Sequence, residues 1–409
     1  MMSKFRFSLF KRKTCWRPTF LGVIVILGAL VIIIRLSLGV VYNVLAINDP
    51  ITSKTLILEG WAPTYVVKDA VKYYNENNYD RLIVTGIPIV NYEFVTIYRN
   101  TAQATILALQ YFGFSDTIYL ADIPTNVYVD RTYHTAVASK LLFDENNWPK
   151  NFNIYSVGVH ARRSRQMFKE AFGDKYDIGI IAPRDHSFLP QYWWKSSKGF
   201  RNVSNEFVAT SFVMLFFHPD YSKSVERIRL GKYIDSIYYS RQDKFVEFSD
   251  TATSRFNWEE INNFHGFKYF DPNIDYRIKA NFVIDTTVPV FEMKTSTDRR
   301  PEYRTYGYLD FVINDTNYRL TAYQNMQYKD HPVHGGSLFI PFKDITNSSL
   351  TYGAGRYIDI PMPKSNKVII DFNSAYNPYC AYYDRWSCPL VPLENHLNVI
   401  IPVGEKKYK

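Results

Sequence analysis

Short apolar runs alternate with helical patterns between residues 55 and 219. The apolar runs lie at 55–58, 81–84, 117–120, 152–157 and 177–181. Apolar residues recur with the helical period at 66–74, 93–112, 132–143, 166–173 and 205–217. Strands that alternate with helices predict a Rossmann-like parallel sheet with both faces covered. In such α/β folds, ligands bind beyond the carboxyl ends of the strands.

The pattern changes in the second half of the chain. Residues 221–260 have the helical period, and polar and apolar residues then alternate at 276–282, 308–313, 318–323, 336–341 and 367–372. Turn signals stand at 314–315 and 352–355. We expect a mainly antiparallel β domain with a helical lead-in. The two patterns predict one globular domain at 47–219 and a second at 220–409.

A third pattern stands at the N-terminus. An apolar run from Phe20 to Ile34 is interrupted by Arg35 and resumes to Ile47, which is long enough to cross a bilayer of about 30 Å. We therefore predict a transmembrane signal anchor at 19–46, with removal as a cleaved signal peptide as the alternative. The basic segment 1–18 would then be cytoplasmic and the globular domains periplasmic or extracytoplasmic, on the inner (cell) membrane.

The distribution of charge along the chain indicates which kinds of binding partner to expect. The net charge of +9 includes six basic residues and no acid within 1–18, so the rest of the chain carries only about +3. This balance does not indicate nucleic-acid binding, and the predicted partner is the membrane. The chain contains no GxGxxG after its first strand, no GxxxxGK[ST] and no GxSxG, so dinucleotide, P-loop and serine-hydrolase chemistry are not supported.

Candidate chemistry gathers where the predicted strands end. Glu59 follows the first strand, Thr85 and Gly86 end the second, and Asp130, Arg131 and Thr132 precede a helix after the third. His160 with Arg162, Arg163 and Arg165 joins the fourth strand to its helix. A helix start with guanidinium groups fits an anion such as phosphate. Each feature also has a structural interpretation: Thr132 as a cap, Asp130 as a partner of arginine, Gly86 as a turn, and the arginines as a solvated first turn.

These motifs together resemble the SanA/ElyC/YdcF family over roughly residues 47–219. The stretches 58–61, 84–86, 130–132 and 160–165 carry the resemblance, while Ile87-Pro88 departs from the small residues of many members. The resemblance implies a Rossmann-like domain on a single membrane anchor, associated with envelope integrity and with cell-wall precursor (peptidoglycan) or lipid-carrier metabolism. It carries over ten candidate site residues: Glu59, Thr85, Gly86, Asp130, Arg131, Thr132, His160, Arg162, Arg163 and Arg165.

The motifs YGxGRYxD at 352–359 and DFNSAYNPYCAY at 371–382, followed by CP and EN, resemble a second family. It is an uncharacterised bacterial β-rich domain that would span about 227–409. The polar residues of these motifs form either a network that pins loops or a pocket for a carbohydrate-like or nucleotide-like ligand; they are Arg356, Tyr357, Asp359, Asp371, Asn373, Asn377 and Glu394. His331, His334 and His396 lack a matching ligand set, so no metal is predicted. Whether Cys380 and Cys388 form a disulfide stays open.

The function expected from the sequence is that of a membrane-anchored envelope protein. Its α/β domain would bind or process a phosphorylated envelope precursor, with a polyprenyl phosphate as one example. His160 would act as general acid or base beside Asp130 or Glu59, and the arginines would hold the phosphate. The alternative is a non-enzymatic scaffold or binding module with any ligand pocket in the C-terminal domain. Reaction, cofactor and oligomeric state stay open.

Overall fold

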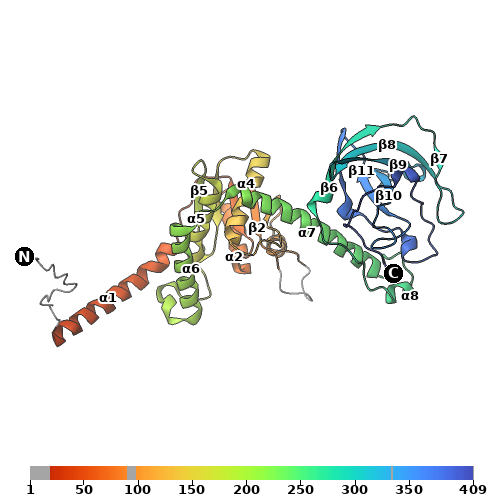
Figure 1. The fold of residues 1–409 in the computed structure, drawn as a ribbon. Coiled ribbons are helices and arrows are strands. Elements are labelled where there is room, and N and C mark those ends of the chain that lie inside the picture. Colours follow the sequence, from red (N-terminus) through yellow and green to blue (C-terminus); the bar gives the residue numbers. More distant parts are fainter. Residues whose placement is uncertain (1–18, 90–97, 333–334, 409) are drawn as a thin grey trace, which may run out of the picture. The chain divides into compact units, whose positions relative to one another are not determined.

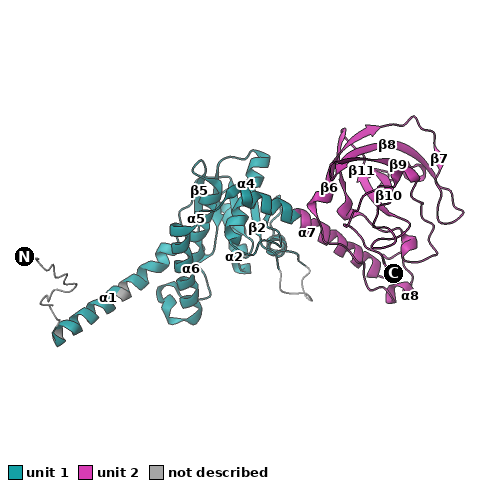
Figure 2. Ribbon diagram, viewed as in Figure 1, with its two compact units in different colours: residues 1–232 teal, residues 233–409 magenta. Residues whose placement is uncertain are grey.

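The computed structural model of the chain describes residues 19–89, 98–332 and 335–408. Contacts divide the chain into two compact units, residues 1–232 and 233–409, which we call unit 1 and unit 2 (Figure 2). The division falls within a long helix, α7 (Tyr221–Ser249). The predicted cytoplasmic segment 1–18, which includes Cys15, lies outside the described residues.

The first described element is the apolar helix α1 (Phe20–Leu45) (Figure 1). An 18-residue stretch within Gly22–Leu45 has a mean hydropathy of 2.8, and the described chain has one helix that is long and apolar enough to cross a membrane. At 1.5 Å per residue, the 24 residues Gly22–Leu45 span about 36 Å. The apolar helix predicted at 19–46 is thus confirmed.

Unit 1 is built on a five-stranded sheet of order β3-β2-β1-β4-β5, in which every pair is parallel. The strands are β1 (Thr55–Glu59), β2 (Arg81–Gly86), β3 (Ile118–Asp122), β4 (Asn151–Tyr155) and β5 (Asp177–Ile181). The helices that alternate with them are α2 (Thr64–Glu76), α3 (Thr101–Tyr111), α4 (Arg131–Asn146), α5 (Ala161–Phe172) and α6 (Ser197–Phe216). This order is Rossmann-like, as predicted. The predicted helix at 93–112 begins at Thr101, and residues 93–97 lie outside the described part.

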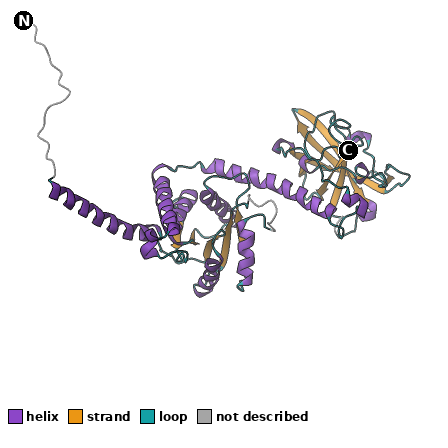
Figure 3. Ribbon diagram, turned by 90° about the horizontal axis from the view of Figure 1, so that it is seen from below, coloured by secondary structure: helices purple, strands orange, loops and turns teal. Residues whose placement is uncertain are grey.

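Side chains alternate across this sheet because successive strand residues point to opposite faces. On β1, Ile57 packs in one apolar cluster with residues of α4 and α5, whereas Leu56 and Leu58 pack in another with residues of α2 and α3. Helices therefore cover both faces (Figure 3). The chain order reverses between β1 and β4, which lie side by side. A ligand crevice is expected at the carboxyl ends of these two strands.

Unit 2 is an antiparallel, curled sheet (Figure 1). Its strands are β6 (Arg277–Ile284), β7 (Phe291–Glu292), β8 (Glu302–Ile313), β9 (Thr316–Asn325), β10 (Ser337–Phe342), β11 (Arg356–Pro361) and β12 (Lys367–Asp371). They follow the order β11-β10-β9-β8-β6-β12, and β7 pairs with β8. The predicted antiparallel β region with a helical lead-in is confirmed. That lead-in consists of α7 and the short α8 (Trp258–Asn262) rather than one helix over 221–260.

The core of unit 2 lies on the inner face of this curled sheet. Burial alternates along β8, where Leu309 and Phe311 are buried with Leu320 of β9. The C-terminal segment has no strand but contributes Ile401 and Val403 to the same apolar cluster. The final residues therefore close the core, although their backbone is not part of the sheet ladder.

Candidate functional site

The candidate site of unit 1 begins with a buried carboxylate, Glu59, at the end of β1. Because β1 pairs in parallel with β4, Glu59 at the end of β1 and Ser156 just after β4 lie at the same edge of the sheet. There the Ser156 hydroxyl donates to one oxygen of Glu59, and the Ser164 hydroxyl on α5 donates to the other at 2.7 Å. Burial would raise the pKa of Glu59, but the charge of His160 and these hydrogen bonds outweigh it and lower the pKa. Glu59 is therefore a buried, ionised group.

His160 lies between two carboxylates. It ends the short 3₁₀ helix η1 (Gly158–His160), and its Nδ1 atom is 2.9 Å from Oε1 of Glu206. Its Nε2 atom is 3.6 Å from Oε1 of Glu59, too far for a hydrogen bond. The ring of Trp61 meets the imidazole edge-on at a centroid distance of 4.8 Å. Nε2 is buried and has no hydrogen-bond partner among the described residues.

These carboxylates set the charge of the imidazole. Burial alone would lower the pKa of His160, but the negative charge of Glu59 and the hydrogen bond to Glu206 raise it to about 9. His160 is therefore an imidazolium at neutral pH. Two donors are then present on the ring, one toward Glu206 and one at Nε2, which faces Glu59 without a hydrogen bond.

Glu206, on α6, links this histidine to Arg163. The guanidinium binds the carboxylate through two hydrogen bonds, from Nε at 2.8 Å and from Nη2 at 2.9 Å. Burial opposes the ionisation of Glu206, but the hydrogen bonds from Arg163 and His160 outweigh it and lower the pKa to about 2. The three side chains form one ion network joining α5, α6 and η1.

Two cavities border this network. The larger one, of about 560 Å³, is lined by Glu59, Trp61, Ile87, Tyr128, Asp130, Arg131, Thr132, Thr135, His160, Arg163, Met167 and Glu206. The smaller one, of about 440 Å³, shares Trp61, His160 and Glu206 and extends to Tyr65, Asp185, Lys198, Asn202 and Asn205. Both volumes are typical of small-molecule sites.

The first turn of α4 forms one wall of the larger cavity. Asp130 precedes the helix in a left-handed conformation, with φ of 50°, and its carboxylate makes no capping bond. Arg131 and Thr132 follow at the lining. Because the first N–H groups of a helix have no intrahelical partner, this wall presents donors and a positive dipole end.

Six of the ten residues predicted for this site lie together at the larger cavity; they are Glu59, Asp130, Arg131, Thr132, His160 and Arg163. Arg162 donates instead to the carbonyl of Val44, and Arg165 pairs with Asp49 at 2.8 Å. With 100° between successive helical residues, Arg162 and Arg165 lie 60° apart on α5, on another side from Arg163. The three guanidinium groups therefore do not converge on one point.

Thr85 and Gly86 support the site without lining these cavities. The amide of Gly60 donates to the carbonyl of Thr85 at 3.0 Å and contacts its hydroxyl at 3.3 Å. A Cβ atom on Gly86 would stand 2.8 Å from Cβ of Ala102, which is too close for normal packing. Thr85 thus anchors the loop that precedes Trp61, and Gly86 leaves room for the start of α3.

The site residues predicted from the sequence did not include Glu206, Ser156, Trp61 or Ser164, although Trp61 and Ser164 lie in the stretches 58–61 and 160–165 that carry the family resemblance. Glu206 is the sole acidic residue of α6, so an isolated acid in an otherwise neutral or basic helix was the available signal. Ser156 could have been found from the strand register, because it follows β4 just as Glu59 ends β1.

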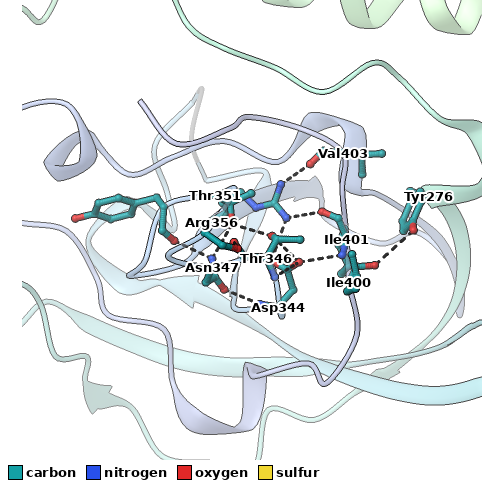
Figure 4. Close-up of polar contacts among 11 residues, drawn as sticks. Tyr276, Asp344, Thr346, Asn347, Thr351, Arg356, Ile400, Ile401 and Val403 are labelled. Carbon is teal, nitrogen blue, oxygen red and sulfur yellow. Dashed lines mark hydrogen bonds and ion pairs between the residues drawn. The ribbon is translucent and has the colours of Figure 1, made fainter. Parts of the chain in front are cut away.

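The motif residue Arg356 of unit 2 lies in a closed polar network (Figure 4). Its guanidinium is fully buried and donates to Asp344 at 3.1 Å and to the carbonyls of Ile401, at 2.9 Å, and Val403. The other oxygen of Asp344 accepts from the amide of Ile401 at 2.9 Å and from Thr346. The network ties β11 to the C-terminal segment.

Two further motif residues bind the helical lead-in to the sheet. Asp371 accepts from the hydroxyl of Tyr233 at 2.9 Å, and the amide of Asn373 donates to the same hydroxyl at 2.8 Å. Asn377 donates to the buried carboxylate of Glu405 at 3.0 Å. These contacts join distant parts of unit 2.

The side chains of the remaining motif residues also make hydrogen bonds within unit 2. Tyr357 donates to the carbonyl of Pro389, while Glu394 accepts from Tyr323 at 2.8 Å and Asp359 from Tyr376 at 2.6 Å. Of the seven motif residues, Asp359 lines the cavity of about 380 Å³ in unit 2. The seven do not gather around one cavity.

Unit 2 contains the candidate histidines and two of the cysteines considered in the sequence analysis. Among the described residues, no group of three or more His, Cys, Asp or Glu side chains could hold a metal ion, and His334 lies outside them. Cys380 and Cys388 are free thiols, and the amide of Cys380 lies 3.3 Å from the sulfur of Cys388. The interaction with Cys388 lowers the pKa of Cys380 to about 6.

Comparisons with known proteins bear on the C-terminal part. Residues 262–406 match the family described as "Protein of unknown function (DUF1684)". The solution NMR structure of an uncharacterized protein from Haloarcula marismortui is 32% identical; the match covers 43% of this chain and 94% of that chain, with a TM-score of 0.35. No curated protein matches the chain. The predicted β-rich domain of unknown function is thus confirmed, whereas the SanA/ElyC/YdcF resemblance of 47–219 lies outside the matched region and stays a prediction.

Proposed function

Because residues 262–406 match a family described as a protein of unknown function, we propose a function from the site of unit 1. Unit 1 binds or processes a phosphate-bearing cell-wall or lipid-carrier precursor. The observation that supports this most is the Nε2 atom of His160, a buried donor that faces Glu59 at 3.6 Å without a hydrogen bond, in a residue that lines a cavity of about 560 Å³.

The donors at the larger cavity suit a phosphate. The imidazolium of His160 offers its Nε2–H, Arg131 adds a guanidinium, and the first turn of α4 adds backbone N–H groups. Charge-assisted hydrogen bonds to phosphate oxygens are stronger than neutral ones. In this proposal Arg131 and His160 hold the phosphate, and Arg163 positions Glu206 rather than the ligand.

A catalytic role follows from the same charges. Glu59 and Glu206 keep His160 protonated near neutral pH, which suits a general acid that protonates a leaving oxygen. Asp130 lies at the lining of the same cavity, where a carboxylate could accept a proton from an attacking group. Release of inorganic phosphate from the bound ligand would show that unit 1 turns over its ligand.

The second candidate is a binding module without catalysis. Arg163 and Arg165 are each paired with a carboxylate, Glu206 and Asp49, which is how arginines behave when they stabilise a scaffold. This candidate predicts ligand binding without release of phosphate.

The proposal extends to the cellular setting. The apolar helix α1 is the single-pass anchor, residues 1–18 are cytoplasmic because they are strongly basic, and both units lie outside the inner membrane in the cell envelope. A lipid-linked phosphate would be available at that location.

Thermal unfolding of the full-length chain in detergent tests the proposal. The ligands are farnesyl phosphate and a nucleotide-activated sugar, with farnesol as the phosphate-free control. A ligand at 100 times its Kd stabilises the folded chain by about 2.7 kcal/mol. We expect farnesyl phosphate, and not farnesol, to raise the melting temperature, and His160→Gln and Arg131→Ala to abolish the effect.

Arg165→Ala is the matched control, since its guanidinium pairs with Asp49 away from the cavity. Equal stabilisation by farnesol, or unchanged binding in His160→Gln, would contradict the proposal. Release of inorganic phosphate from the bound ligand then separates an enzyme from a binding module.

A further inference from the structure

The helix α6 exposes a broad apolar face. Seven of its apolar side chains are between 49% and 68% exposed, Met214 among them. We define the other six as the α6 face; they are Phe200, Phe207, Val208, Phe212, Leu215 and Phe216. At 100° per residue they cover one side of the helix, opposite Glu206, Thr210 and Val213, which face the interior of unit 1. Exposed Arg201 and Asn205 interrupt the first turns of this side, and the α6 face is apolar from Phe207 onward. An exposed apolar surface of this kind marks an interaction site.

The same helix packs against the end of α1. Val203 of α6 is buried with Tyr42 and Leu45 in one apolar cluster. Immediately before α6, in the 3₁₀ helix η2 (Pro190–Lys195), the indole of Trp193 donates to the carbonyl of Leu38 at 2.8 Å. At 100° per residue, buried Val203 lies 40° from exposed Phe207 around α6, so one edge of the α6 face lies beside the contact between α6 and α1.

The composition around the face is that of a helix lying in a membrane interface. Tyr192 and Trp194 precede α6, and aromatic residues of this type are enriched at the level of lipid headgroups. Exposed Lys195, Lys198 and Arg201 flank its first turn, whereas its one acid, Glu206, is paired inside. Basic charge next to an apolar face favours anionic lipid.

We infer that the α6 face rests on the surface of the lipid bilayer that α1 crosses. The C-terminal turns of α1 pack on α6 and η2, so only the preceding turns are free to contact lipid. The bilayer surface should therefore lie where α1 meets α6 and η2. This inference rests on α1 as a membrane span and not on the ligand proposed for the site. It also places Glu206, on the other side of the same helix, within one helix diameter of lipid.

Photo-crosslinking of the full-length chain in vesicles tests this surface. p-Benzoylphenylalanine replaces Phe207 or Phe212 in separate variants, and the vesicles contain phosphatidylethanolamine and phosphatidylglycerol. We expect roughly fivefold or more lipid adduct at these positions relative to a control position away from the membrane. Because these side chains are on the surface, the substitutions keep the fold.

Tyr111 on α3 is the control position, as an aromatic residue that is 84% exposed on the same unit. Lipid adducts at Phe212 no more frequent than at Tyr111 would overturn the inference. Crosslinked dimers in place of lipid adducts would overturn it too, because they would show that a second copy covers the face. Either result leaves the ligand proposal to be judged on its own experiment.

Discussion

Two buried ion networks distinguish the units of this chain. In unit 1, His160 lies between Glu59 and Glu206, and in unit 2 Arg356 pairs with Asp344. Each network leaves one nitrogen without a hydrogen bond, Nε2 of the histidine and Nε of the arginine. His160 lines two cavities, whereas Arg356 lines none of those described above. Burial and an unpaired donor are therefore insufficient to indicate a site, and access for a ligand makes the difference.

The largest expected effect is in unit 2, with Arg356→Met. Removing the guanidinium leaves Asp344 buried without its cation, which costs about 3–5 kcal/mol of the free energy of unfolding. Urea unfolding of the full-length chain measures the loss. Arg319→Met is the matched control, because its bidentate pair with Asp310 on the same sheet is exposed and contributes about 0–1 kcal/mol. Equal losses in the two variants would contradict a structural role for Arg356.

A smaller effect is expected in unit 1 for Arg163→Ala. The substitution removes two charge-assisted hydrogen bonds from Glu206 and should cost about 2–3 kcal/mol of unfolding free energy. Arg165→Ala should cost about 0–1 kcal/mol, since its partner Asp49 is exposed to solvent. The same urea unfolding compares them. A loss in Arg165→Ala as large as in Arg163→Ala would show that both arginines are structural to the same degree.

The third prediction concerns pH. The pKa of His160 is raised to about 9 in the folded chain, above its ordinary value of about 6.5. Its contribution to stability is therefore complete below about pH 6.5 and lost as the pH rises through 9. Glu59→Gln should weaken this dependence, because it removes the charge that raises the pKa of His160 most, while the carboxylate of Glu206 still opposes burial. Histidine ¹⁵N chemical shifts, followed from pH 5 to pH 10, measure it.

His134 provides an internal control for that titration. Burial lowers the pKa of His134 below its ordinary value, so this ring should titrate at lower pH than His160. A titration of His160 near its ordinary value in the unmodified chain would contradict the ion network as described.

The sequence predicted the architecture of unit 1 better than its site. Alternating strand and helix patterns led to the parallel sheet, because local periodicity determines which face of each element is buried. The prediction that Arg162, Arg163 and Arg165 together hold one phosphate does not match their positions, because helix geometry points side chains that are adjacent in sequence in different directions. Glu206 lies 46 residues beyond His160 in the chain, so its pairing depends on tertiary packing that no local pattern records.

The smallest effect tests how unit 2 holds its loops. Tyr357→Phe removes one hydroxyl, which donates to the carbonyl of Pro389 from a side chain that is buried. The loss should be about 1 kcal/mol of unfolding free energy, because the carbonyl loses its partner while the ring keeps its packing. Tyr318→Phe is the control, since its hydroxyl contacts the carbonyl of Asn398 at 3.2 Å in an exposed position and should change stability by less than about 0.5 kcal/mol. If neither variant changed the free energy of unfolding, stabilisation of loops would not explain the polar residues of the unit 2 motifs. The cavity beside Asp359 would then be the first place to test for a ligand.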